Sequence, residues 1–136
     1  MRVCLDTNVL VAAFATRGLC ADVLRTVLAE HDLVIGDVIL EELRRALSVK
    51  LKLPRDRMAS VEAALASVPV VPKPKAPSDV DVRDVDDRWV LATAVEGTAD
   101  VLVTGDRDLL DARAQAPIRI LDPREFWEML REGSSS

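Results

Sequence analysis

The sequence has 136 residues, 49% of them hydrophobic, which is enough for one domain with a substantial core. No apolar run approaches the roughly 18 residues of a membrane helix and no signal-peptide pattern opens the chain, so we expect a cytoplasmic protein without a membrane partner. A single histidine, His31, argues against zinc sites built on several histidines and against Ser-His-Asp or Cys-His mechanisms. The two cysteines follow no metal-binding pattern, and we assign them no chemistry.

The formal net charge of -5 is unfavourable for binding a polyanion only if the charges are spread evenly. Between residues 44 and 57, however, six basic residues stand against one acid, whereas between residues 79 and 111 ten acids stand against three arginines. The acidic segment needs either solvent or cations. The basic segment can follow a nucleic-acid backbone, and a solvated basic helix without a partner is the alternative. Its candidate nucleic-acid contacts are Arg44, Arg45, Lys50 and Lys52.

The first predicted element is a buried strand that ends at a carboxylate. Residues 3–5 are apolar without helical period, which is typical of a strand covered on both faces. Asp6 follows directly, in an Asp-Thr-Asn triplet that suits the start of a helix over residues 9–14. Asp6 is thus expected at the carboxyl end of a strand, where open α/β sheets hold their ligands. A capping or turn-forming role is the alternative for Asp6 alone.

The next elements are a helix over residues 21–30, a strand over 33–35 and a helix that starts at Gly36-Asp37. Leucines at positions 40, 43, 47 and 51 form one stripe of this last helix. Glu42 lies on the flank of the stripe. A carboxylate at the edge of a buried face suggests a binding partner, although such a side chain can also simply reach water.

An unusual run of acids marks the second half of the chain. It follows a helix from Pro54 to about residue 67, a short strand over 69–71 and a proline-rich connector over 73–78. Five aspartates between residues 79 and 87 then lead into a helix over 89–97. Acids stabilise helix starts by roughly 0.3 to 1 kcal/mol each, but five exceed what capping needs. We therefore expect some of them to bind a cation.

The last third repeats the design of the N-terminus. An apolar strand over residues 101–104 ends at a polar turn over 105–108, so that Asp106 is a second strand-end carboxylate. A strand over 118–121 and a helix over 123–130 complete a single domain, expected over residues 1–131. Residues 132–136 are expected to form a flexible tail.

Strands that alternate with helices predict an α/β fold. We expect a three-layer α/β/α sandwich with a central, mainly parallel sheet of about five strands and right-handed connections. Loops after parallel strands open at one edge of the sheet. Asp6 and Asp106 can therefore meet there, and Asp87 and Glu42 can join them from nearby helix starts.

Four segments together resemble the PIN-domain family of metal-dependent nucleases, particularly the small single-domain toxins of toxin-antitoxin pairs. They are DTNVL at the N-terminus, the EELRRAL helix, the DDRWVLATA helix and the block VLVTGDRDLL, in the order and at the spacing of the family. The resemblance implies an RNA substrate, a cognate antitoxin whose peptide blocks the acidic cleft, and a homodimer.

Residue by residue, the family pattern places its carboxylates on Asp6, Glu42, Asp87 and Asp106, with Asp108 as a frequent addition. Thr104 or Asn8 supplies polar support in this pattern, and Asp84 matches an extra acid of one branch of the family.

Chemistry argued from the residues agrees with that pattern. Several carboxylates share a small site only if cations offset their repulsion or some of them hold protons. Oxygen ligands without a histidine or thiolate cluster suit Mg²⁺ or Mn²⁺, which can activate water for in-line attack on a phosphodiester. We hypothesise that Asp6 and Asp106 are the chief ligands, that Asp87 holds a second ion or a water, and that Glu42 binds through water or orients the nucleophile. The supporting or phosphate-contacting candidates are Thr7, Asn8, Thr104 and Arg107.

Two other functions compete with this endoribonuclease interpretation. A PIN-fold module kept only for protein binding would retain the same acids without turnover. A phosphoacceptor or phosphatase domain with Mg²⁺ also places aspartates at strand ends, but it fits poorly. Its dehalogenase type requires a second acid where this chain has Asn8, and its response-regulator type requires an acidic pair where this chain has only hydrophobic residues.

Overall fold

A parallel five-stranded sheet forms the centre of the computed structural model, which describes residues 1–134. The strand order is β3-β2-β1-β4-β5, and all four pairings are parallel. The strands are β1 (Arg2–Leu5), β2 (Asp32–Gly36), β3 (Val70–Val71), β4 (Val101–Val103) and β5 (Arg119–Leu121). The predicted α/β class with a parallel sheet of five strands is confirmed.

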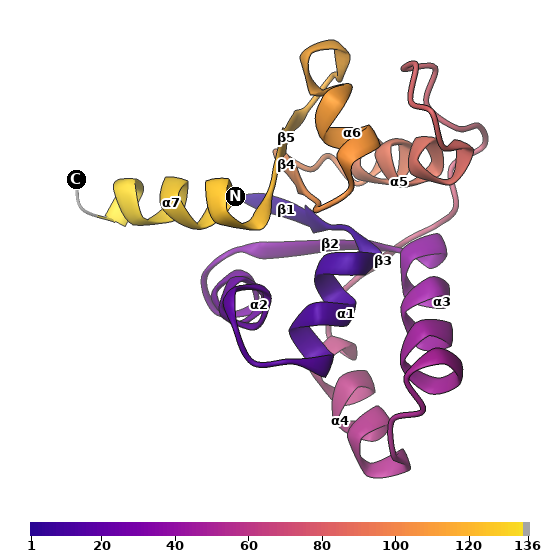
Figure 1. The fold of residues 1–136 in the computed structure, drawn as a ribbon, viewed down its shortest axis with the longest axis vertical. Coiled ribbons are helices and arrows are strands. Elements are labelled where there is room, and N and C mark those ends of the chain that lie inside the picture. Colours follow the sequence, from indigo (N-terminus) through magenta and orange to yellow (C-terminus); the bar gives the residue numbers. More distant parts are fainter. Residues whose placement is uncertain (135–136) are drawn as a thin grey trace.

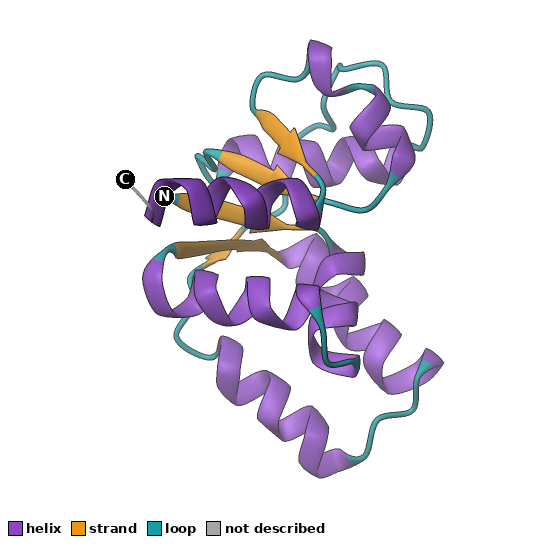
Figure 2. Cartoon of the chain, turned by 60° about the vertical axis from the view of Figure 1, so that its left-hand side comes forward, coloured by secondary structure: helices purple, strands orange, loops and turns teal. Residues whose placement is uncertain are grey.

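Helices cover both faces of this sheet. In Figure 1, α1 and α2 lie below the strands and α5 lies above them, and the turned view of Figure 2 shows the same layers. The helices are α1 (Thr7–Ala15), α2 (Leu19–Glu30), α3 (Asp37–Arg45), α4 (Arg55–Leu65), α5 (Val85–Glu96), α6 (Arg107–Asp111) and α7 (Pro123–Ser134). A π-helical segment, η1 (Ala46–Lys50), continues α3, and a 3-10 turn, η2 (Arg113–Gln115), follows α6.

The central strand β1 is the most completely buried. Val3, Cys4 and Leu5 have no exposed surface, as expected for a strand covered on both faces, and Cys4 pairs with Val34 of β2 and Leu102 of β4. Burial also raises the pKa of the Cys4 thiol far above its ordinary value, so this cysteine packs as a small apolar side chain.

The order in which the chain adds strands to the sheet reverses beside β1. The chain runs outward from β1 to β2 and β3, crosses back, and continues from β4 to β5 on the other side. The connections that leave β1 and β4 therefore diverge to opposite faces and open a crevice at the carboxyl ends of these two strands. Asp6 follows β1 at this point and Thr104 follows β4.

Two helices start where the sequence predicted a polar segment, because aspartates at strand ends and in loops also cap helices. Asp84 accepts a hydrogen bond from the Asp86 N–H (2.9 Å), and α5 begins at Val85 rather than at residue 89. Asp106 caps α6 in the same way, so the predicted polar turn over 105–108 runs into a short helix. Asp87 consequently lies in the first turn of α5.

The predicted leucine-striped helix changes its winding before it ends. α3 stops at Arg45 and continues as the π-helical η1, which holds Leu47 in the core but leaves Leu51 49% exposed. Wider winding rotates the later residues away from the stripe, and Lys52 closes the segment in the left-handed conformation (φ 52°). Leu51 therefore leaves the core stripe to which its spacing had assigned it.

Contacts at both ends hold α5 against the sheet. At its start, the Ser78 N–H donates to the Arg88 carbonyl (3.0 Å) from the proline-rich connector. At its end, the Arg2 guanidinium donates to the Gly97 carbonyl from Nε (3.0 Å) and Nη2 (2.7 Å). Midway, a Cβ on Gly36 would lie 2.2 Å from Thr93 Cγ2, so only glycine allows α5 to approach β2 this closely.

The C-terminal helix is capped at its start and runs further than predicted. Asp122 and Glu125 form a reciprocal capping box, in which the Glu125 N–H donates to Asp122 (2.7 Å) and the Asp122 N–H donates to Glu125 (3.0 Å). α7 continues to Ser134, so residues 132–134 of the predicted flexible tail are helical. The last two residues of the predicted tail lie outside the described part of the chain.

Within residues 1–134, no single helix is long and apolar enough to cross a membrane. Taken together, α1 and α2 are long and apolar enough, but the chain bends by 103° at their junction. Most of their apolar side chains belong to the hydrophobic core, whereas Leu28 of α2 is exposed.

Candidate metal centre

Six carboxylates line one cleft of about 610 Å³ at the carboxyl ends of β1 and β4, and four of them are Asp6, Glu42, Asp87 and Asp106. They come from four different elements, namely the end of β1, α3, the start of α5 and the end of β4. The structure thus brings together the four acids that the sequence singled out.

Asp6 is held rigidly at the base of this cleft. Its side chain is nearly buried, with Oδ1 accepting from the Thr7 N–H (2.7 Å) and Oδ2 accepting from the Thr104 hydroxyl (2.7 Å). The hydrogen bond from the Thr7 N–H caps α1. Asp6 therefore has the capping role given above as the alternative, and it also lines the cleft. Its oxygens keep lone pairs for a further partner.

Two threonine hydroxyls connect the carboxylates to one another. The Thr104 hydroxyl donates to Asp6 and accepts from the Asp106 N–H (3.0 Å), which joins the two strand-end acids. The Thr7 hydroxyl donates to Glu42 Oε2 (2.8 Å) and aims that side chain into the cleft. Both threonines are buried, so these bonds fix the acids in place.

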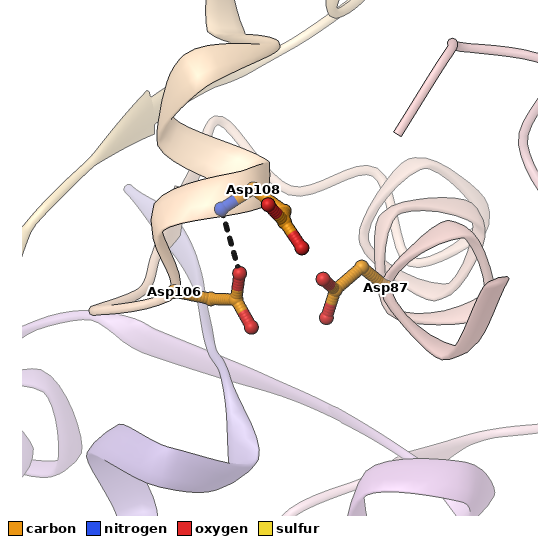
Figure 3. A group of neighbouring side chains, drawn as sticks. All are labelled: Asp87, Asp106 and Asp108. Atoms are coloured by element: carbon orange, nitrogen blue, oxygen red, sulfur yellow. Dashed lines mark hydrogen bonds between the residues drawn. The ribbon is translucent and has the colours of Figure 1, made fainter. Parts of the chain in front are cut away.

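Three aspartates approach closely enough to share one cation. One carboxylate oxygen each from Asp87, Asp106 and Asp108 lies within 4.8 Å of the other two, and Figure 3 shows these carboxylates facing a common space. The Asp108 N–H donates to Asp106 Oδ1 (2.8 Å), which orders the turn that carries both. Asp87 and Asp106 line the cleft together with Asp6 and Glu42, whereas Asp108 is not among its lining residues. Asp6 and Glu42 fall outside the group of three, while our hypothesis named Asp6 and Asp106 as the chief ligands.

One oxygen in the group has no partner. Asp87 Oδ2 is buried and receives no hydrogen bond from any residue in the described part of the chain. A buried carboxylate oxygen without a donor is costly, because folding removes its water and returns nothing. Mg²⁺ or Mn²⁺ would supply the missing positive charge, and the all-oxygen donor set suits these hard ions.

The electrostatics of the cleft agree with this fit. Burial and, after it, the negative charges of Asp106, Asp6 and Asp84 raise the pKa of Asp87 to about 7. Burial also raises the pKa of Asp6, although its two hydrogen-bond donors act in the opposite direction. Full ionisation of the cleft is thus unfavourable without a cation, as expected for carboxylates packed this closely.

The remaining acidic and polar candidates surround the cleft. Asn8 and Asp84 are exposed and line its rim, together with Asp86, which the sequence analysis had not separated from the acidic run. The run of aspartates was itself the signal for Asp86. Choosing among its members required the start of α5, which fixes the side toward which each side chain points.

The predicted basic contacts separate into two groups. Arg45 and Lys50 line the acidic cleft, whereas Arg44 points to α4 and donates to Glu62 from Nε (2.8 Å) and Nη2 (3.0 Å). Lys52 follows η1 and does not line the cleft. Arg107 also does not line it and faces a separate groove on the other side of Asp106.

Comparison with known proteins agrees with this architecture. The chain of a crystal structure of VapBC2 from Rickettsia felis, bound to a DNA fragment from its promoter, superposes with a TM-score of 0.62 at 15% identity, over 90% of this chain and 98% of that one. A chain of FitAcB from Neisseria gonorrhoeae gives 0.57 at 18% identity, over 89% and 97%. Among curated proteins, no relative matches this sequence. The sequence model of the PIN domain matches residues 2–108, and because this is well over half of its length, the chain belongs to the PIN-domain family.

Proposed function

We propose that this protein is an endoribonuclease that depends on Mg²⁺ or Mn²⁺ and serves as the toxin of a toxin-antitoxin pair. The observation that carries the proposal is the buried, unpartnered oxygen of Asp87 beside the carboxylates of Asp106 and Asp108. Capping of α6 accounts for Asp106, but it does not account for three carboxylates this close together, because they repel one another and Asp87 is desolvated.

In the proposed mechanism the three clustered aspartates would hold the metal ion, with Asp6 lining the same cleft as Asp87 and Asp106. A bound divalent ion supplies activated water and neutralises charge on the leaving oxygen. Thr104 keeps Asp6 and Asp106 in register across the two strands. Glu42, oriented by Thr7, accepts a proton from the attacking water or orients it.

The substrate would enter along the open rim of the cleft. Asn8 and Asp84 lie at the rim, and Arg45 and Lys50 bring positive charge to one side of the acids, where backbone phosphates of RNA can lie. Recognition through the backbone is consistent with an aromatic content of only 3%.

An antitoxin partner and a homodimer form part of this proposal. They are supported by the resemblance of the sequence to single-domain PIN toxins and by the likeness in fold to the VapBC2 and FitAcB chains. An antitoxin segment that occupies the acidic cleft would need a basic residue to offset its charge.

Cleavage of a mixed RNA pool by the purified protein tests the proposal. We expect cutting with Mg²⁺ or Mn²⁺ that disappears with EDTA and in Asp106→Asn, which keeps the size of the side chain but removes its charge. Asp111→Asn, at the exposed end of α6, is the matched control and should cut like the wild type.

Two results would contradict the proposal. If calorimetry detects Mn²⁺ binding but no RNA is cut, the cleft binds metal without turnover and the protein acts as a binding module. If Mn²⁺ does not bind at all, the assignment of the three aspartates as ligands is wrong.

A further inference from the structure

A second hollow lies beside the acidic cleft, at the same edge of the sheet. This basic groove, of about 450 Å³, lies beyond the carboxyl ends of β4 and β5 and contains two exposed arginines, Arg107 and Arg124. Gly105, shortly after β4, and Asp122, directly after β5, form parts of its wall. The acidic cleft occupies the crevice between β1 and β4, so the two hollows are neighbours along one edge.

A single turn separates the two hollows. Gly105, Asp106 and Arg107 are consecutive, yet Asp106 lines the acidic cleft while the residues on either side of it line the basic groove. Gly105 is exposed, and no atom lies within 4 Å of the place where a Cβ would stand. No side chain therefore stands over this point of the turn between the two hollows.

The guanidinium groups of the two arginines of the groove are free of polar contacts within residues 1–134. Neither makes an ion pair or a hydrogen bond with any residue in the part of the chain that the structure describes. Nearby Arg113, by contrast, pairs with Glu125 (2.9 Å). Arg124 also lies in the first turn of α7, where the helix dipole disfavours a cation. A free guanidinium in such a position suits recognition of an anion better than stabilisation of the helix.

The groove contains one acidic side chain, and this side chain is already engaged. The Asp122 carboxylate accepts a hydrogen bond from the Glu125 N–H in the capping box of α7. Two arginines against one hydrogen-bonded carboxylate leave the groove positive in a protein whose formal net charge is -5. Guanidinium groups bind phosphate oxygens in bidentate geometry, so backbone phosphate is the ligand class that this groove fits.

We propose that the basic groove binds the RNA backbone on one side of the cleaved bond, while Arg45 and Lys50 bind it on the other side. This inference rests on the proposed nuclease function and adds to it the path of the substrate. The strand enters past Arg45 and Lys50, places one phosphate over the acidic cleft, crosses Gly105 and continues between Arg107 and Arg124. Cations on both flanks offset the repulsion between the RNA and the acids that bind the metal.

The salt dependence of RNA binding tests the groove without requiring cleavage. Fluorescence anisotropy with a labelled single-stranded RNA of mixed sequence is measured in Mg²⁺, on the non-cleaving Asp87→Asn background. Removing one arginine that binds a phosphate lowers the slope of log affinity against log salt by about 0.7, which is about fivefold in Kd at 0.1 M salt. We expect Arg107→Ala and Arg124→Ala each to show this decrease, and the double variant to show about twice the slope change.

Matched variants separate a binding role from general effects. Arg119→Ala removes the same charge from an exposed arginine at the amino end of β5, outside both hollows and outside the basic segment 44–57, and should leave the slope unchanged. Lysine at positions 107 and 124 should restore most of the slope, because the charge returns. Unchanged thermal melting of the alanine variants shows that they fold.

The outcomes distinguish this inference from the proposal on which it rests. If the double alanine variant binds RNA like Arg119→Ala while the wild type cuts RNA, the groove assignment is wrong and the nuclease function stands. If the groove variants weaken binding but no preparation cuts RNA, the groove stands and the nuclease proposal fails. If wild-type protein binds no RNA at any salt concentration, both are wrong.

Discussion

Replacing Asp87 by asparagine should stabilise the metal-free protein at alkaline pH. Burial and neighbouring charges raise the pKa of this carboxyl to about 7, against an ordinary value of 3.8. A folded-state pKa above the unfolded value means that the folded protein holds the proton more tightly. The contribution of Asp87 to stability is therefore highest below about pH 4, falls as the pH rises from there to about 7, and is level above that. Asparagine cannot ionise, so the variant should lose most of this dependence.

The size of the effect follows from the shift. Each pKa unit corresponds to about 1.4 kcal/mol, which sets an upper limit of about 4 kcal/mol for the difference between the ordinary and the raised value. The cleft is open to solvent on one side and can relax, so we expect a gain of about 1 to 3 kcal/mol at pH 8. For a chain of this length that is a rise of about 3 to 12 °C in Tm.

Thermal melting in EDTA at pH 5 and pH 8 measures this directly. Asp87→Asn should melt above the wild type at pH 8, with a smaller difference at pH 5, and the exposed Asp111→Asn should follow the wild type at both. Added Mn²⁺ should reverse the order, because only the wild type gains binding energy. A lower Tm for Asp87→Asn in EDTA at pH 8 would refute the argument, since it would show that the carboxylate is satisfied without a metal.

Three further substitutions test the surroundings of the cleft. Thr104→Val removes the hydroxyl that joins the two strand-end carboxylates and should lower the free energy of unfolding by about 1 to 3 kcal/mol, measured by chemical denaturation. Thr104→Ser should keep most of the stability. A valine variant as stable as the wild type would contradict the hydrogen bonds described. Gly36→Ala forces a methyl group against a buried threonine of α5 and should lower the free energy of unfolding by about 1 to 3 kcal/mol. Gly18→Ala is the control, because no atom lies near its Cβ and its stability should change little. Equal melting temperatures for the two variants would count against the close packing of α5. Arg45→Ala should weaken RNA binding more than Arg44→Ala, because the Arg44 side chain is already engaged in an ion pair with α4. If fluorescence anisotropy shows a larger loss of affinity for Arg44→Ala, Arg45 does not lie on the substrate path.

Much of the sheet could be predicted because its strands are short apolar runs that end at polar residues. The position of Asp6 followed from that pattern alone, since a buried strand and a helix start leave only one place for the residue between them. Thr104 and Asp106 followed in the same way. These predictions depended on local sequence and on the parallel arrangement of the strands, which together determine at which edge of the sheet these residues lie.

Side-chain direction could not be predicted where it depends on packing between distant segments. Arg44 and Arg45 are adjacent in one helix, and only the position of α4 decides that the first pairs with Glu62 while the second reaches the cleft. Leu51 fits its stripe by spacing, but the π-helical winding of η1 turns it outward. Arg107 is separated from the cleft by the turn at Asp106, which sequence spacing does not reveal.

The hydrogen bond between Asp6 and Thr104 spans 98 positions of the chain and closes the pairing of β1 with β4. During synthesis, therefore, most of the polypeptide must be made before Asp6 can form its hydrogen bond with Thr104. A ribosome that stalls, or a protease that cuts, before β4 leaves a fragment with Asp6 and Glu42 but without Asp106 and Asp108. For the proposed ribonuclease, this late assembly means that a chain ending before β4 lacks two of the three clustered aspartates.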